Sequence, residues 1–217
     1  ETISYTKRSS GGSTSGGSHT GSGSSNTGNK NDQEQNGNNA SNGGFTDVSV
    51  NAYYTDAVKW AVEKKITSGT SASTFSPDAS CTRAQIVTFL WRNAGSPAVS
   101  GSASKFTDVA SDAYYADAVA WAVEKGITSG TSAATFSPDA ACTRAQIVTF
   151  LWRAAGSHAA AAADQQFSDI ASDAYYAAAA AWASEKGITS GTSTAKFSPD
   201  SACTRAQSVT FIYRAYK

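Results

Sequence analysis

The sequence predicts an all-α protein in which three tandem helix-loop-helix repeats follow a polar tether. The first observation is an internal repeat of 61 residues, which is marked by the aromatic residue that opens each unit: Phe45, Phe106 and Phe167. The second is the similarity of the copies, since residues 45–94 and 106–155 differ at 9 of 50 positions, and residues 106–155 and 167–216 at 12. The third is that each copy holds two stretches with helical periodicity. A fixed period of this kind is typical of repeat architectures.

The chain begins with a segment unlike the repeats. Residues 1–8 resemble the end of an upstream segment, and residues 9–44 consist almost entirely of Gly, Ser, Asn, Thr and Gln. Such a composition buries too little apolar surface to offset the entropy lost on ordering. We therefore expect residues 9–44 to act as a flexible, disordered linker between the repeats and whatever precedes them.

The first helix of each repeat is expected from Tyr53 to about Lys65 and its equivalents. In repeat one its buried stripe follows helical spacing and comprises Tyr54, Ala57, Val58, Ala61 and Val62. Gly126 and Gly187 stand where a left-handed residue ends such a helix. Repeat one has Lys65 there, which should cost about 1 kcal/mol if the geometry is the same.

A loop rich in Gly, Ser, Thr and Pro joins the two helices, and Phe75, Phe136 and Phe197 are expected to anchor it in the core. The second helix opens on Thr82-Arg83-Ala84-Gln85, a capping box in which the Thr hydroxyl and the Gln amide satisfy backbone groups reciprocally. Cys81 and Ile86 take the positions of a hydrophobic staple. The helix should end near Arg92, a cation that suits the C-terminal dipole.

The three cysteines are predicted to be buried and unpaired. No His or other base recurs beside Cys81, Cys142 or Cys203, as a nucleophilic thiol would need. Single cysteines 61 residues apart also do not form the close pairs of a zinc site. We therefore expect no catalytic residue, no metal and no cofactor.

The repeat boundaries are placed at residues 45–97, 106–157 and 167–217. One helix pair of this size has little core of its own, so three copies are expected to pack on each other around a pseudo-threefold axis, within one monomer.

The 17 Lys and Arg balance the 17 Asp and Glu, so the net charge creates no overall positive potential that would favour nucleic acid. No apolar run is long enough for membrane insertion. The acids recur with the scaffold and no unique carboxylate pair stands out, so the segment is not expected to be an enzyme, although an upstream catalytic domain is left open.

The order of these motifs resembles the S-layer homology (SLH) domain. The resemblance rests on Phe45-Thr46-Asp47-Val48, Ala57-Val58, Ile66-x-x-Gly69, Phe75-x-Pro77 and Thr82-Arg83-Ala84-Gln85, and it occurs three times over residues 45–217. It implies a pseudo-trimeric helical bundle whose clefts between repeats bind an acidic secondary cell-wall polysaccharide, often one that carries pyruvate ketals.

The same resemblance implies which residues meet the ligand. The arginine of the family's Thr-Arg-Ala-Glu motif corresponds to Arg83, Arg144 and Arg205. The family's aromatic residue at the start of the first helix, commonly Trp, corresponds to Tyr53, Tyr114 and Tyr175. The sequence departs from the family pattern at Gln85, Gln146 and Gln207, where Glu is usual. The cap tolerates Gln, but a ligand role of that Glu is put in doubt here.

The residues themselves support an anion site. An arginine at the start of a helix adds positive charge where the dipole is already positive, so the arginine, the dipole and exposed backbone N–H groups together would suit a carboxylate. The alternative is an ion pair with a recurrent acid such as Asp47 or Asp78. Tyr53 could stack on sugar rings or pack between repeats, whereas packing is favoured for Trp60.

The function predicted from the sequence is non-covalent anchoring of an exported protein in the cell wall or S-layer, outside the cell. The alternative is a protein-interaction or S-layer assembly module that does not bind glycan directly. The sequence leaves the exact sugar, the organism and the cargo open.

Overall fold

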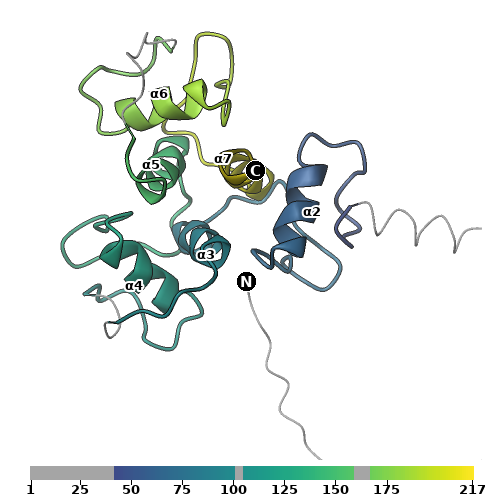
Figure 1. The fold of residues 1–217 in the computed structure, drawn as a ribbon, viewed down its shortest axis with the longest axis horizontal. Coiled ribbons are helices and arrows are strands. Elements are labelled where there is room, and N and C mark those ends of the chain that lie inside the picture. Colours follow the sequence, from purple (N-terminus) through teal and green to yellow (C-terminus); the bar gives the residue numbers. More distant parts are fainter. Residues whose placement is uncertain (1–41, 101–104, 159–166) are drawn as a thin grey trace, which may run out of the picture.

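The computed structural model describes residues 42–100, 105–158 and 167–217, and the predicted upstream segment and most of the predicted linker lie outside these ranges. The described residues form six helices and no strand, which confirms the all-α prediction (Figure 1). The helices are α2 (Thr55–Glu63), α3 (Arg83–Asn93), α4 (Ala116–Glu124), α5 (Arg144–Ala154), α6 (Ala177–Glu185) and α7 (Arg205–Tyr216). Each repeat contributes one shorter and one longer helix.

The first helices begin later than the sequence predicts. α2 starts at Thr55, so Tyr53 precedes the helix and does not lie on it. The cause is a turn before each helix, which the backbone N–H of the first helical residue closes: Thr55 donates to the Ala52 carbonyl, Ala116 to Ala113 and Ala177 to Ala174, at 2.9 to 3.1 Å. In repeat one the Thr55 hydroxyl adds bonds to the carbonyls of Ser49 at 2.6 Å and Ala52 at 2.9 Å. Asn42, at the end of the predicted linker, is buried and donates through its amide to the Val48 carbonyl at 3.1 Å.

The ends and starts of the helices follow the predicted chemistry. Lys65, Gly126 and Gly187 all have left-handed φ values, of 58°, 68° and 67°. All three second helices open with a complete capping box. In α3, the Thr82 hydroxyl accepts from the Gln85 N–H at 3.2 Å, and the Gln85 side chain accepts from the Thr82 N–H at 3.1 Å.

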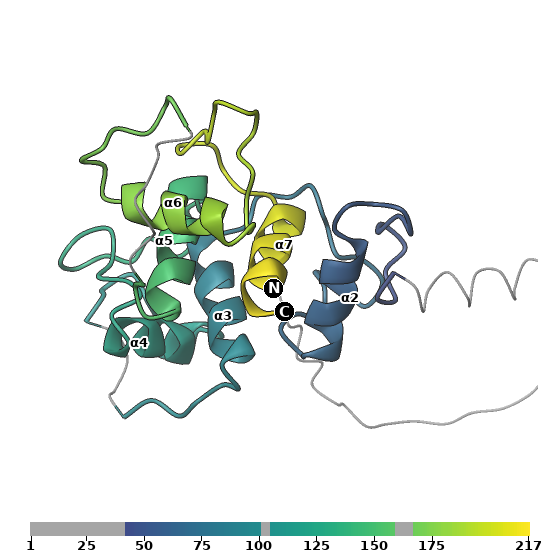
Figure 2. The same ribbon diagram turned by 45° about the horizontal axis from the view of Figure 1, so that its top comes forward.

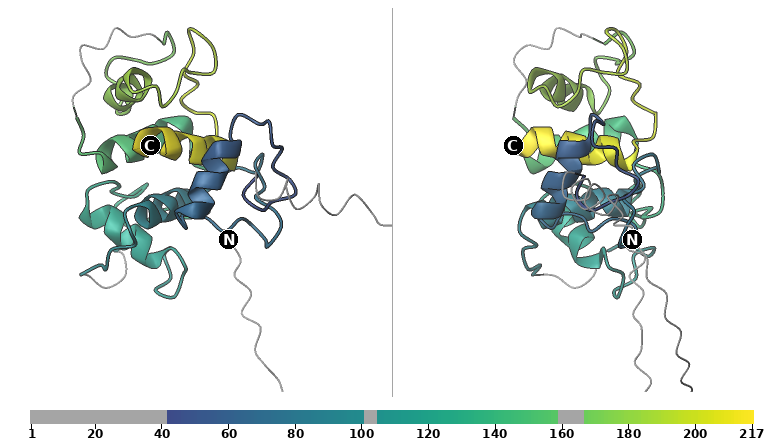
Figure 3. Two further views of the ribbon diagram at one scale, coloured as in Figure 1. Left: turned by 45° about the vertical axis from the view of Figure 1, so that its right-hand side comes forward. Right: turned by 90° about the vertical axis from the view of Figure 1, so that its right-hand side faces the viewer.

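Each first helix packs against the second helix of the preceding repeat. α4 packs on α3 and α6 packs on α5, while α2 packs on α7, which joins the first repeat to the last (Figures 1 and 2). The second helices also contact one another, α3 with α5 and α5 with α7. The turned views in Figure 3 likewise place α7 beside α2. The core is therefore shared between repeats, because each apolar helix face is covered by a neighbouring repeat.

The cysteines lie where the three repeats meet. The Cys81 N–H donates to the Cys203 carbonyl, the Cys142 N–H to Cys81 and the Cys203 N–H to Cys142, at 2.8 to 2.9 Å, so the bonds close a ring. All three thiols are buried and none forms a disulfide. Burial raises the pKa of Cys142 well above its usual range and that of Cys203 to about 12. The predicted loop anchors, Phe75, Phe136 and Phe197, are likewise buried.

Candidate ligand-binding groove

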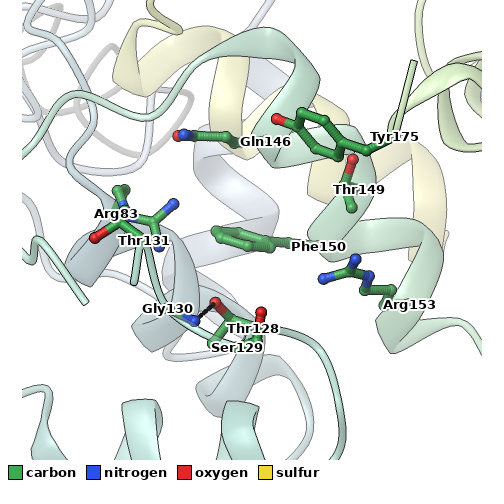
Figure 4. Close-up of a pocket in the computed structure, with 10 residues that line it drawn as sticks. All are labelled: Arg83, Thr128, Ser129, Gly130, Thr131, Gln146, Thr149, Phe150, Arg153 and Tyr175. Atoms are coloured by element: carbon green, nitrogen blue, oxygen red, sulfur yellow. Dashed lines mark hydrogen bonds between the residues drawn. The ribbon is translucent and has the colours of Figure 1, made fainter. Parts of the chain in front are cut away.

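A cavity of about 370 Å³ lies where segments of all three repeats meet (Figure 4). Repeat one contributes Arg83 from the start of α3, and repeat three contributes Tyr175 from the turn before α6. Repeat two contributes the rest of the wall: Thr128, Ser129, Gly130, Thr131, Gln146, Thr149, Phe150 and Arg153. The site thus exists only when the repeats are packed together.

Arg83 is held deep in this wall. Its side chain is 3% exposed, its Nε donates to the Phe136 carbonyl at 2.9 Å, and its guanidinium lies over the rings of Phe136 at 4.8 Å and Phe150 at 5.4 Å. Burial lowers the pKa of Arg83. Its Nη2 is buried with no hydrogen-bond partner among the described residues. An unsatisfied buried donor is costly, so an acceptor on a ligand would be favoured there.

Arg144 and Arg205 are held in the same way. Arg144 Nε donates to the Phe197 carbonyl at 2.7 Å and Arg205 Nε to the Phe75 carbonyl at 2.8 Å, and each guanidinium lies over two Phe rings. The terminal groups differ. Arg144 Nη2 donates to the Thr189 hydroxyl at 3.1 Å, whereas both terminal nitrogens of Arg205 are buried without a partner in the described part of the chain.

Two expectations about the arginines are not met. The backbone N–H groups at the start of α3 are not exposed, because those of Arg83 and Ala84 donate to the carbonyls of Ala140 and Pro138 in the next repeat. The helix start is therefore occupied by protein, and the guanidinium itself is what faces the cavity. The Asp47 carboxylate also does not act as the predicted ion-pair partner, since it accepts from the N–H groups of Phe75 at 2.8 Å and Ser76 at 2.7 Å.

The equivalent acids support the arginine indirectly. The Asp108 carboxylate accepts from the Phe136 and Ser137 N–H groups at 2.8 and 2.7 Å, and Phe136 is the residue whose carbonyl and ring hold Arg83. Burial acts to raise the pKa of Asp108, but the two backbone N–H groups outweigh it and the pKa is lowered. The pKa of Asp169 is lowered for the same reason: burial acts to raise it, but hydrogen bonds from the Phe197 and Ser198 N–H groups outweigh burial. The acid fixes the loop that positions the guanidinium.

The predicted tyrosines lie at the surface. Tyr175 is 62% exposed and lines the cavity, so the structure brings it together with Arg83 although the two are in different repeats. Tyr53 is 64% exposed and interacts electrostatically with Arg144, whereas Tyr114 is 36% exposed. The predicted packing role of Trp60 is confirmed, because its ring meets Tyr213 of the third repeat edge-on, with centroids 5.5 Å apart.

Sequence reasoning missed four cavity residues on α5. The sequence predicts a cap role for Gln146 and leaves its contact with ligand open, and it predicts no ligand role for Thr149, Phe150 or Arg153. Positions 146, 149, 150 and 153 follow the spacing i, i+3, i+4, i+7 and so share one face of the helix. That spacing, measured from the motif glutamine, was the available signal.

No group of His, Cys, Asp and Glu that could hold a metal ion is found in the part of the chain that the structure describes. None of the described helices has the length and apolar character needed to cross a membrane.

Several curated proteins are similar to part of this chain. A cell surface protein of Thermoanaerobacter kivui is 34% identical over 114 residues, which are 51% of this chain and 15% of that protein. The surface-layer 125 kDa protein of Lysinibacillus sphaericus is 33% identical over 102 residues, 47% of this chain and 8% of that protein. An endoglucanase of Bacillus sp. (strain KSM-635) is 36% identical over 110 residues, 51% of this chain and 11% of that protein. The chain therefore matches only a small part of each relative.

The S-layer homology domain matches three successive segments, residues 44–87, 105–148 and 166–207. These segments correspond to the three repeats and include the capping boxes and the buried arginines. Domains of this kind are non-catalytic modules that bind cell-wall polymers and anchor proteins at the cell surface, so the chain is located at the cell envelope. The chain belongs to the S-layer homology domain family and carries three tandem copies of the domain.

Proposed function

We propose that this chain anchors an exported protein non-covalently by binding an acidic cell-wall polysaccharide, including pyruvylated forms, in the grooves between its repeats. The observation that carries the proposal is Arg83, a buried guanidinium with an unpartnered Nη2 in a cavity built from all three repeats. An arginine remains protonated in proteins, and its planar donors suit a carboxylate.

The cavity offers groups for the rest of a sugar. The exposed ring of Tyr175 can stack on the apolar face of a pyranose, and its hydroxyl can bond to a sugar hydroxyl. Thr128, Ser129 and Gln146 bring further polar groups to the wall. Phe150 covers the guanidinium and lowers the local dielectric, which strengthens an ionic hydrogen bond.

The arrangement of the repeats supports three related grooves. The cyclic bonds between the cysteines, the repeated arginine contacts and the packing of α2 on α7 are consistent with a pseudo-threefold bundle formed by one monomer. Under this proposal Arg83, Arg144 and Arg205 each serve one groove, with Tyr175, Tyr53 and Tyr114 as the aromatic surfaces.

The cargo of the anchor lies outside this chain's repeats. The relatives include a protein named for its surface layer and one named an endoglucanase. We propose that the module is joined to different functional partners, and that residues 9–44 separate it from its own.

Sedimentation with cell-wall sacculi tests the function. Because the arginines are packed between Phe rings, Met is a better replacement than Ala: it keeps apolar volume and removes the charge. The triple variant Arg83→Met, Arg144→Met, Arg205→Met should lose binding to Lysinibacillus sphaericus sacculi while keeping the helical circular dichroism signal. Each charge-assisted contact is worth about 1.5–3 kcal/mol, and binding should also weaken as salt rises.

A matched control removes the same number of charges elsewhere. Lys64, Lys125 and Lys186 occupy equivalent exposed positions at the ends of the first helices, and changing them to Gln should leave binding intact. If the arginine variant is folded and still sediments like the parent, the arginine–anion proposal is wrong. Equal binding to sacculi stripped of polysaccharide would favour the protein-interaction alternative.

A further inference from the structure

We infer that Arg153 is a second ligand-binding cation in this cavity, so that the groove recognises two anionic groups on the glycan. The inference rests on the proposed function and specifies the ligand class further. The family motif gives one arginine for each groove, whereas the cavity contains two, Arg83 from α3 and Arg153 from the last turn of α5.

In the view of Figure 4, one aromatic ring lies between the two guanidinium groups. Figure 4 shows Phe150 between them, with Arg83 on one side and Arg153 directed toward the cavity on the other. They differ in depth, since Arg83 is almost fully buried and Arg153 is partly exposed. A ligand that reaches both must therefore extend across the ring of Phe150.

The Arg153 guanidinium has more N–H donors than its hydrogen bond within the protein uses. Its Nη1 donates to the Ile127 carbonyl at 3.2 Å, which joins the end of α5 to the loop that forms the floor of the cavity. A guanidinium carries five N–H donors, so this bond orients the group and leaves others for a ligand. Thr149 has its own partner, because its hydroxyl donates to the Ala145 carbonyl at 2.7 Å.

No acid lines the cavity. Asp108 interacts electrostatically with Arg83 from outside the lining, where its carboxylate already accepts from two backbone N–H groups. None of the ten lining residues is Asp or Glu, although the chain as a whole has equal numbers of acidic and basic residues. Two arginines in a partly enclosed wall concentrate positive potential and attract a ligand with more than one negative charge. The geometry fits either consecutive acidic sugars or one sugar that bears two acidic groups, with an apolar ring face against Phe150.

The equivalent residue of another groove is held similarly. Arg214 Nη1 donates to the Ile188 carbonyl at 3.2 Å, and Arg214 interacts electrostatically with Tyr53, which also interacts with Arg144. The pairing of a deep and an outer arginine therefore recurs with an exposed tyrosine nearby.

The test measures affinity at this groove alone. Soluble acidic polysaccharide fragments released from Lysinibacillus sphaericus sacculi are titrated into ¹⁵N-labelled protein, and the amide shifts of Ser129 and Gly130 report the cavity separately from the other grooves. Arg153→Gln removes the charge but keeps a donor for the Ile127 carbonyl. We expect it to weaken binding by about tenfold or more at low salt, with a shallower dependence on salt.

Two variants separate charge from structure. Arg153→Lys should recover most of the affinity because it keeps the cation, and Lys125→Gln, which removes an exposed charge outside the lining, should bind like the parent. If Arg153→Gln binds within about twofold of the parent with the same salt dependence, the inference is wrong and the proposed function stands. If Gln and Lys weaken binding equally and both lower the melting temperature, Arg153 only holds the loop, which also overturns it. A parent that does not bind would overturn the proposed function with it.

Discussion

At the scale of residues, the site depends on a chain of contacts from an acid through a loop to an arginine. The Asp108 carboxylate accepts hydrogen bonds from the Phe136 and Ser137 N–H groups. The Phe136 carbonyl in turn accepts a hydrogen bond from Arg83 Nε. Ser137 follows with a left-handed φ of 58°, a conformation that the two bonds to the carboxylate hold in place. The acid and the cation therefore both bond to the backbone of one loop, and they interact electrostatically without a direct ion pair being seen among the described residues.

Asp108→Asn should destabilise the fold at neutral pH by about 1–3 kcal/mol, because an amide can accept from only one side and the second N–H loses its charged partner. The pKa of Asp108 is lowered in the folded protein. The contribution of the ionised Asp108 carboxylate to the free energy of unfolding is therefore complete above the pKa of the unfolded state, near 4. It is lost as pH falls through the pKa of the folded state. Urea unfolding measured from pH 7 down to pH 3 should show the parent and the variant converging in acid. A difference that stays constant across this range would show that the carboxylate charge is not responsible.

At the scale of elements, the ends of the first helices offer a test of backbone strain. Lys65 has a φ of 58° where the other repeats have Gly126 and Gly187. A Cβ placed on Gly126 would meet nothing within 4 Å, so the left-handed backbone alone sets the cost of a side chain there. Repeat one therefore carries a local penalty that its neighbours avoid.

Lys65→Gly should raise the free energy of unfolding by up to about 1 kcal/mol, and Gly126→Lys should lower it by a similar amount, because only glycine adopts this conformation without a Cβ penalty. Reversible chemical denaturation of the two single variants measures the change in the free energy of unfolding for each, and the two changes should have opposite signs. Two changes of the same sign would mean that the surface contacts of Lys65 matter more than its backbone.

Much of the element-level structure could be predicted from local sequence. The capping box of Thr82 and Gln85 and the anchoring role of Phe75 depend on residues close in the chain or on a simple apolar pattern. The predicted start of α2 is too early, because the turn that the Thr55 N–H closes on the Ala52 carbonyl has no sequence periodicity to mark it. The sequence predicts exposed backbone N–H groups beside Arg83, whereas these groups donate to carbonyls of the next repeat. A period of 61 residues shows that the units repeat, but it does not show which residues of neighbouring units come into contact.

At the scale of the whole molecule, each joint between repeats uses residues that are far apart in sequence. Arg205 Nε reaches the Phe75 carbonyl, the Cys81 N–H reaches the Cys203 carbonyl, and Tyr213 meets Trp60. The third repeat therefore closes the assembly against the first. Its stability affects both of its neighbours, because each shares a helix interface with it.

The third repeat is also the one with the thinnest packing surface. Val58 and Val119 become Ala180, and Ile86 and Ile147 become Ser208, and all of these positions are fully buried. Among the described residues, the Ser208 hydroxyl donates to the carbonyl of Thr204, the cap of its own helix, at 2.8 Å. A third difference, Ser184 in place of Val, falls at a partly buried position and should matter less.

We expect hydrogen exchange to show residues 167–217 opening before residues 45–157, because fewer buried methyl groups hold the third repeat. The double variant Ala180→Val, Ser208→Ile should raise the melting temperature by several degrees, since each buried methylene contributes about 0.8 kcal/mol and 1 kcal/mol shifts a domain of this size by roughly 2–4 °C. Ser184→Val is the control and should change the melting temperature little. If the double variant melts below the parent, neighbouring helices have already closed around the small side chains, and the added methyl groups overpack the joint that α7 makes with its neighbours.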